Sequence, residues 1–226
     1  MTVFHVPQPE VPITGSDASF PVHRIYCVGR NYAAHAREMG NDPSREPPFY
    51  FMKPADSVVP GGGDVRYPPR TSDLHHEVEL VVAIGKGGQD IALDHASDHI
   101  FGYAVGIDLT RRDLQMDAKD AGRPWDTGKS FEQAAPISCL RRVADTGYLT
   151  RGRIWLSVND ELRQEADLGD MIWNVAEAIA ELSTFFTLAA GDLLFTGTPA
   201  GVGAVVVGDQ ISAGIDGVDT IDVTIV

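Results

Sequence analysis

The stretch Leu74-His75-His76-Glu77-Val78-Glu79-Leu80-Val81-Val82-Ala83-Ile84 constrains the fold of this chain more than any other. From Glu77 onward its apolar and β-branched residues predict a strand, which ends at a Gly-rich turn after Ile84. Side chains alternate across a strand, so Glu77 and Glu79 should point to the same face. Two such carboxylates inside an apolar strand are costly to bury unless positive charge compensates them.

A third carboxylate is placed by a second apolar run, Ile100–Ile107, which delivers Asp108 at its end. Three carboxylates on two apolar strands indicate an oxygen-only site for a hard divalent cation. The alternative is that one or two of them pair with Arg or Lys side chains. The spacing of these residues leaves both interpretations open.

The charge balance limits the partners, because 18 Lys and Arg stand against 32 Asp and Glu and the formal net charge is −14. Such an acidic surface argues against nucleic acid and anionic membranes, and an anionic substrate would need a local basic patch. No apolar run approaches the roughly 20 residues of a membrane span. The first residues lack the basic and apolar regions of a signal peptide, and Cys27 and Cys139 alone suggest no disulfide framework. We therefore expect a cytoplasmic protein.

The chain of 226 residues fits one domain with a sizeable core. Residues 1–24, spaced by Pro, predict an extended N-terminal arm, and residues 25–226 predict a single catalytic domain. The clearest helix is expected from Met171 to about Leu188, with Asp170 as its N-cap and its apolar stripe in the core.

A short helical segment carries His35 and Glu38, which are neighbours on one face because they lie three residues apart. A carboxylate beside an imidazole fixes its orientation and raises its basicity, as a general base requires. The alternative is a surface His–Glu pair. Farther along, the loop 197–203 follows a predicted strand. It offers backbone N–H groups and the Thr198 hydroxyl to an anion, or it simply connects two strands.

The tripeptide Gly128-Lys129-Ser130 suggests a P-loop, but the surrounding sequence excludes one. The phosphate cradle requires Gly at position 123, where this chain has Arg123, and no strong apolar strand precedes it. Nucleotide binding is therefore not expected, and Lys129 remains as a cation in a short segment bounded by turns.

Taken in order, these segments resemble the fumarylacetoacetate hydrolase family from about residue 25 to the C-terminus. The resemblance is carried by Gly29-Arg30-Asn31-Tyr32 with His35 and Glu38, Lys53-Pro54, His75-His76-Glu77-Val78-Glu79-Leu80, Asp108, Thr110, Arg112-Asp113, Gln115, Gly128-Lys129-Ser130-Phe131 and Thr196-Gly197-Thr198-Pro199-Ala200-Gly201-Val202-Gly203. The short chain resembles the acylpyruvase branch of the family. Within it, segments 42–49 and 122–128 are most similar to the fumarylpyruvate hydrolases.

The resemblance implies an α+β fold that is mostly β, a mixed β-sandwich roll with a few helices, usually assembled as a homodimer. It implies Mg²⁺, or alternatively Mn²⁺, bound by Glu77, Glu79 and Asp108. By position, His35 and Glu38 match the family's catalytic pair and Lys129 matches its site lysine. The implied substrate-binding residues are Arg30, Lys53, Gln115 and Thr198.

The implied reaction is the metal-dependent hydrolysis of a carbon–carbon bond in a small anionic 2,4-dioxo acid, an acylpyruvate. With 3-fumarylpyruvate, an intermediate of aromatic catabolism, the products would be fumarate and pyruvate. Oxaloacetate decarboxylation is an alternative, since it needs the same metal-stabilised enolate but no attacking water. Two further alternatives are an isomerase or hydratase acting on a related 2-oxo acid, and a scaffold that only binds one.

Overall fold

The strand predicted from the apolar run is β8 (Val78–Ile84), and all of its residues are buried. The computed structural model describes residues 2–38 and 46–226, apart from the side chain of Ala36. Alternation along β8 places Leu80 and Val82 in the larger of two hydrophobic cores, and Val81 and Ala83 in the smaller one. Apolar packing thus covers both faces of β8, and Glu79 shares the face of the smaller core.

The sheet that contains β8 is mixed and has eight strands. They follow the order β4-β3-β15-β8-β9-β11-β5, with β12 paired to β9. The pairs β3–β15 and β5–β11 are parallel, whereas β8 runs antiparallel to both of its neighbours. The bounds of the other strands are β3 (Ile25–Gly29), β4 (Phe49–Lys53), β5 (Val58–Pro60), β9 (Ile100–Ile107), β11 (Ala135–Ile137), β12 (Arg141–Arg142) and β15 (Leu193–Phe195).

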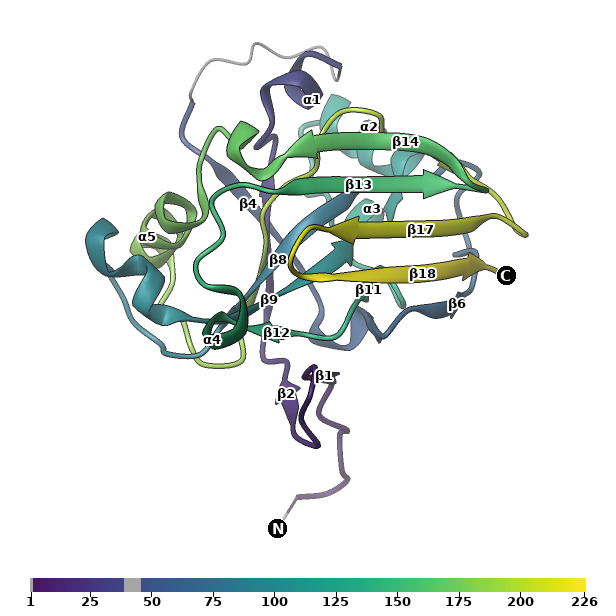
Figure 1. Ribbon diagram of the computed structural model, residues 1–226. Coiled ribbons are helices and arrows are strands. Elements are labelled where there is room, and N and C mark those ends of the chain that lie inside the picture. Colours follow the sequence, from purple (N-terminus) through teal and green to yellow (C-terminus); the bar gives the residue numbers. More distant parts are fainter. Residues whose placement is uncertain (1, 39–45) are drawn as a thin grey trace.

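A second sheet of five strands packs over β8 and β9 and encloses the larger core (Figure 1). In order, its strands are β14 (Glu161–Asp167), β13 (Arg153–Val158), β17 (Gln210–Ile215), β18 (Asp219–Ile225) and β6 (Gly63–Val65). A small sheet joins the two at the end where the carboxylates lie. Its strands are β10 (Thr110–Arg111), β7 (Leu74–His76) and β16 (Gly203–Val205).

The helices of the described residues are short, and α1 and α2 lie together at the upper end of the sheets in Figure 1. The α-helices are α1 (Ala33–Glu38), α2 (Arg112–Asp120), α3 (Asp126–Lys129), α4 (Val143–Thr146) and α5 (Val175–Phe185), and 3₁₀ turns span Ala55–Ser57, Leu93–His99 and Leu168–Asp170. Over the described residues, no helix combines the length and the apolar character needed to cross a membrane. Curled mixed sheets with few helices confirm the predicted fold class.

The predicted start of the long helix was wrong. Helix α5 begins at Val175, with Asn174 as its N-cap and Glu177 completing a capping box. Asp170 instead belongs to the preceding 3₁₀ turn, where it completes a capping box with Asp167. Both segments carry a valid start signal, and the helix follows the one that directly precedes the apolar run.

Residues 10–21 of the predicted arm form a hairpin, in which β1 (Glu10–Pro12) pairs with β2 (Ser19–Pro21). Val11 and Phe20 are buried in the smaller core, and the ring of Phe20 packs 5.2 Å from that of Phe101. The hairpin closes the lower end of the molecule (Figure 1). Of the loop 42–49, residues 42–45 lie outside the described residues.

Candidate active site

The three predicted carboxylates meet where β8 begins and its antiparallel neighbour β9 ends. Glu79 pairs with Gly106 across the two strands, and the backbone N–H of Asp108 donates to the carbonyl of Glu77 at 2.8 Å. As a result, one oxygen from each of Glu77, Glu79 and Asp108 lies within 4.8 Å of the others. All three side chains are buried. Such a set of oxygens is the one that hard divalent cations prefer.

Buried cations contact two of these carboxylates, Glu77 and Asp108. For these two, the alternative that carboxylates pair with Arg or Lys side chains is therefore also correct. Lys129 Nζ lies 2.8 Å from Glu77 Oε2 and 2.7 Å from Asp108 Oδ2, and it donates to Thr110 Oγ1 at 2.6 Å. Arg112 also pairs with Glu77. Glu79 has no such cation among the described residues, and its partner is the backbone N–H of Gly197, at 2.7 Å.

The pKa values show where positive charge is missing. Burial would raise the pKa of Glu77, but Lys129 and Arg112 outweigh it and hold that pKa well below its usual range. Burial together with the charges of Asp108 and Glu77 raises the pKa of Glu79 well above its usual range. A divalent cation at this position would replace the proton of Glu79, so the residues present fit such an ion.

The His35–Glu38 pair is held over the pocket by helix α1. His35 Nδ1 lies 3.2 Å from Glu38 Oε2, and the same carboxylate accepts the backbone N–H of Gly201 at 3.1 and 3.2 Å. A carboxylate accepts only, so Nδ1 carries a proton, and in the neutral imidazole the lone pair is then on Nε2. His35 lines the pocket and is only 6% exposed, which distinguishes this pair from a surface pair.

Aromatic rings form one wall of the pocket, from β4 and the segment before α3. Phe49 meets Trp125 edge-on at 5.2 Å, and Phe51 lies 5.9 Å from the same indole. Gly29 permits this wall, because a Cβ there would lie 2.0 Å from the Phe49 ring. Arg30 follows with a left-handed φ of 58° and places its guanidinium 5.2 Å from the centre of that ring.

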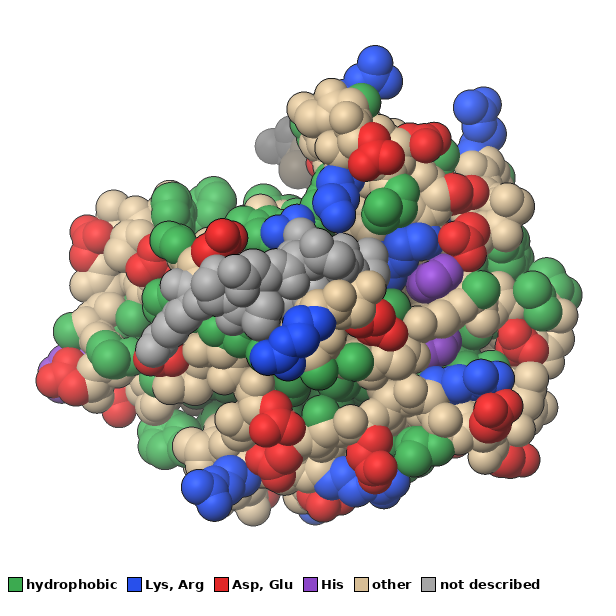
Figure 2. Space-filling view, turned by 90° about the horizontal axis from the view of Figure 1, so that it is seen from above, with side chains coloured by type: hydrophobic (Ala, Val, Ile, Leu, Met, Phe, Trp, Pro, Cys, Tyr) green, Lys and Arg blue, Asp and Glu red, His purple; other side chains and the backbone are tan. Residues whose placement is uncertain are grey.

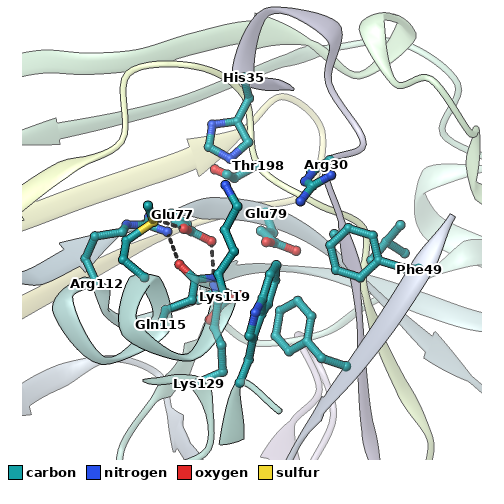
Figure 3. A pocket seen from close by; sticks show the side chains of 16 residues that line it. Arg30, His35, Phe49, Glu77, Glu79, Arg112, Gln115, Lys119, Lys129 and Thr198 are labelled. Carbon is teal, nitrogen blue, oxygen red and sulfur yellow. Dashed lines mark hydrogen bonds and ion pairs between the residues drawn. The ribbon is translucent and has the colours of Figure 1, made fainter. Parts of the chain in front are cut away.

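Helix α2 forms the opposite wall, and two of its pocket residues, Met116 and Lys119, were not predicted from the sequence. Arg112, Gln115, Met116 and Lys119 all line the pocket. Their spacing of i, i+3, i+4 and i+7 is that of one helix face, which is the sequence signal that could have identified Lys119. In Figure 3 the Lys119 side chain extends into the pocket below His35 and Thr198. Within the described part of the chain, Lys119 has no ion-pair partner.

Most of the predicted site residues therefore line one pocket: Arg30, His35, Glu77, Glu79, Asp108, Gln115, Lys129 and Thr198. Glu38 and Lys53 do not line the pocket: Glu38 lies behind His35, and Lys53 lies behind Asp108. The ammonium of Lys53 is 2.8 Å from Asp108 Oδ1 and donates to the carbonyls of Leu109 and Lys129. Its position indicates a supporting contact to Asp108 and none with the cavity.

Figure 2 shows the molecule from the side on which α1 and α2 lie. Lys, Arg and His side chains gather near the middle of this face. A local basic patch of this kind is what a chain with a net charge of −14 needs to attract a small anion.

The sequence and the fold match known proteins over nearly their whole length. The family described as fumarylacetoacetate (FAA) hydrolase C-terminal matches residues 24–226. A fumarylpyruvate hydrolase from Ralstonia sp is 49% identical over 185 residues, covering 81% of this chain and 95% of the relative. A mitochondrial oxaloacetate decarboxylase from Dictyostelium discoideum is 42% identical over 198 residues, covering 87% and 90%.

A crystal structure of fumarylpyruvate hydrolase from Pseudomonas aeruginosa, in complex with Mn²⁺ and pyruvate, superposes with a TM-score of 0.98. It is 52% identical and covers 100% of this chain and 99% of its own. The chain therefore belongs to the fumarylacetoacetate hydrolase family and is an enzyme, a hydrolase that acts on carbon–carbon bonds.

Proposed function

We propose that this enzyme hydrolyses acylpyruvates in a metal-dependent reaction, with 3-fumarylpyruvate as the substrate and fumarate and pyruvate as the products. The observation that carries the proposal is the convergence of Glu77, Glu79 and Asp108 beneath the His35–Glu38 pair. The similarity to a fumarylpyruvate hydrolase that holds Mn²⁺ and pyruvate supports the same substrate class.

Glu77, Glu79 and Asp108 would hold a divalent cation, Mg²⁺ or Mn²⁺. When bound, that ion supplies a Lewis acid for the negative charge that develops on the pyruvate enolate as the bond breaks. Lys129 and Arg112 offset the charge of Glu77 and hold the carboxylates in place.

His35 would act as the general base. Its Nε2 would take a proton from water as the oxygen attacks the 4-oxo carbon of the substrate, while Glu38 stabilises the imidazolium that forms. Cleavage of the bond between carbons 3 and 4 then leaves a carboxylic acid and the pyruvate enolate. The proton on His35 would return to carbon 3 of the enolate, so that protons balance over the cycle.

The anionic ends of the substrate would be bound by the pocket cations that have no carboxylate partner among the described residues. Lys129 already uses its three N–H groups on Glu77, Asp108 and Thr110. Arg30 and Lys119, from opposite walls, are open to substrate (Figure 3). A dicarboxylate with a flat, unsaturated spacer suits two cations in a pocket that is also lined by aromatic rings.

Oxaloacetate decarboxylation is the second candidate, because a 42% identical relative carries that name. It shares the enolate but consumes no water. His35 is therefore the residue that separates the two reactions, since only hydrolysis requires a base for water.

Turnover by the purified enzyme tests the proposal directly. We would follow ultraviolet absorbance with fumarylpyruvate, acetylpyruvate and oxaloacetate, each with Mg²⁺ or Mn²⁺ and each with EDTA. The proposal predicts turnover of fumarylpyruvate that EDTA abolishes. Exclusive turnover of oxaloacetate, or ion-independent cleavage, would contradict it.

Replacing His35 by Ala should lower kcat for fumarylpyruvate by about 10²- to 10⁴-fold, the usual contribution of a general base. Decarboxylation of oxaloacetate, if present, should be much less affected. The matched control is His95→Ala, which removes an exposed histidine that also pairs with a carboxylate three residues on. Normal fumarylpyruvate cleavage by His35→Ala would exclude the proposed base.

A further inference from the structure

Gln164 is a buried polar residue in an exposed edge strand. It is fully buried in β14, whereas Leu162 is 48% exposed. The pairing explains this inversion: Leu156 pairs with Gln164 and Ser157 with Leu162, so Arg163 is the extra residue of a β-bulge. Bulges redirect side chains, and this one directs an amide toward the pocket loop 197–203.

Two partners of the Gln164 amide are chemically unambiguous and fix its orientation. The backbone N–H of Val78 can only donate and lies 3.0 Å from Oε1, whereas the carbonyl of Pro199 can only accept and lies 2.8 Å from Nε2. The second hydrogen on Nε2 is then directed to Thr198 Oγ1, at 2.8 Å. His76 Nδ1 donates to Oε1 at 3.1 Å, so every hydrogen-bonding site of the amide is used.

We infer that Gln164 is a positioning residue that makes the Thr198 hydroxyl a hydrogen-bond donor to the substrate. Because Thr198 Oγ1 already accepts from Gln164, its own proton needs an acceptor, and none lies among the described residues. Thr198 is 3% exposed and lines the pocket, into which its hydroxyl points (Figure 3). The carboxylate and oxo groups of a 2-oxo acid are acceptors only, so a fixed donor complements them.

The loop that carries Thr198 also contacts the other functional parts of the site. Its Gly197 N–H donates to Glu79, and its Gly201 N–H donates to Glu38. Gly201 fits directly against the bulge, where a Cβ would lie 2.0 Å from the carbonyl oxygen of Arg163. Gln164 therefore holds Thr198 in a fixed position relative to both Glu79 and the His35–Glu38 pair.

The inference is tested by a double-mutant cycle on pyruvate binding, measured by isothermal titration calorimetry with Mn²⁺ present. Gln164→Glu keeps the shape and the acceptor but loses both N–H donors. Its carboxylate would accept a hydrogen bond from the Thr198 hydroxyl, which would then no longer donate into the pocket. Thr198→Val removes the hydroxyl at constant shape. Each variant should bind pyruvate about tenfold more weakly, and the double variant no more weakly than either single one.

Gln210→Glu is the matched control, because it makes the same change at an exposed glutamine of the same sheet, and it should bind as the unchanged enzyme does. Losses that multiply in the double variant, or unchanged binding by folded Gln164→Glu, would overturn the inference. If Gln164→Glu does not fold, Gln164→Met replaces it in the cycle with the same expected coupling.

The inference rests on the proposed function only for the class of ligand, a 2-oxo acid. An enzyme that binds pyruvate with the predicted coupling but cleaves no acylpyruvate would refute the proposed function and support the role of Gln164. An enzyme that binds no pyruvate in the presence of Mn²⁺ would overturn the role of Gln164.

Discussion

Two lysines of one pocket differ in what their ammonium groups contact. Lys129 is buried and donates to two carboxylates and a hydroxyl, whereas Lys119 reaches the cavity without an ion pair in the described structure. An ammonium group that is already paired with carboxylates, as in Lys129, holds those carboxylates in place. An ammonium group without such a partner in the described structure, as in Lys119, is available to bind an anionic ligand. The residue that family motifs identify is thus the supporting one, and the open cation was found only from the structure.

Replacing Lys119 by Met should raise KM for fumarylpyruvate by about 10- to 150-fold, because a charge-assisted hydrogen bond of roughly 1.5 to 3 kcal/mol is lost from the distal carboxylate. Acetylpyruvate has no second carboxylate, so its KM should change much less. Steady-state kinetics on both substrates provide the measurement. Lys86→Met, at an exposed turn, is the control. Equal changes for both substrates would place Lys119 elsewhere in the reaction.

Residue identities at the site were largely predictable, and their contacts were not. Strand alternation placed Glu77 and Glu79 together, a second apolar run placed Asp108 beside them, and the ordered motifs implied the roles of His35 and Thr198. The family resemblance implied that Lys53 contacts the substrate. Its ammonium lies instead under Asp108, a contact that depends on how β4 and β9 pack.

At the scale of elements, helix α5 shows how two valid start signals compete. Asp170 and Asn174 both take part in capping boxes, and only the bend that follows the 3₁₀ turn of Asp170 lies between them. The residue pattern could not rank them. The β-bulge at Arg163 was equally hidden, because a bulge is defined by the partner strand and leaves no periodic signal of its own.

Asn174→Ala should lower the free energy of unfolding by about 1 kcal/mol, the usual cost of losing an N-cap. Urea denaturation followed by circular dichroism measures the change. Asn174→Ser retains a hydroxyl that can accept the Glu177 N–H, so it should recover most of the loss. A Ser variant as unstable as the Ala variant would show that Asn174 contributes through something other than the cap.

For the whole molecule, the sequence predicted a mostly β fold but could not give the arrangement of its sheets. The short strands pair across long sequence separations, as β6 does with β18 and β3 does with β15. Such pairings arise because both faces of β8 must be buried. No local sequence pattern predicts which strands pair. The N-terminal hairpin was missed for the same reason, since Val11 and Phe20 are apolar residues whose partners lie far along the chain.

The stability of the metal-free enzyme should fall as pH rises above about 4.5, the ordinary pKa of Glu79. The folded state retains a proton on Glu79 that the unfolded chain has already lost, so unfolding releases a proton in this range. Urea unfolding in EDTA at pH 5 and pH 8 measures the slope. Glu79→Gln should show a smaller fall than the unchanged enzyme, and equal slopes would contradict the assignment.

The unchanged enzyme and the Glu79→Gln variant also test whether Glu79 binds a divalent cation. At a free concentration 100 times its Kd, a bound divalent cation should stabilise the unchanged enzyme by about 2.7 kcal/mol. Glu79→Gln loses one of the three carboxylates, so it should gain far less at the same concentration. Thermal denaturation with Mn²⁺ or Mg²⁺ against EDTA provides the readout. Equal stabilisation of both proteins would mean that the ion binds elsewhere.

The buried carboxylates Glu77, Glu79 and Asp108 are matched in number by the buried cations Lys53, Arg112 and Lys129. With Glu79 ionised these charges cancel, so a bound divalent ion leaves a surplus of two positive charges, and a dianionic ligand cancels that surplus. Ion and ligand should therefore bind with positive cooperativity, so that each raises the affinity of the enzyme for the other by the same factor. Removal of the ion should therefore weaken substrate binding by that factor.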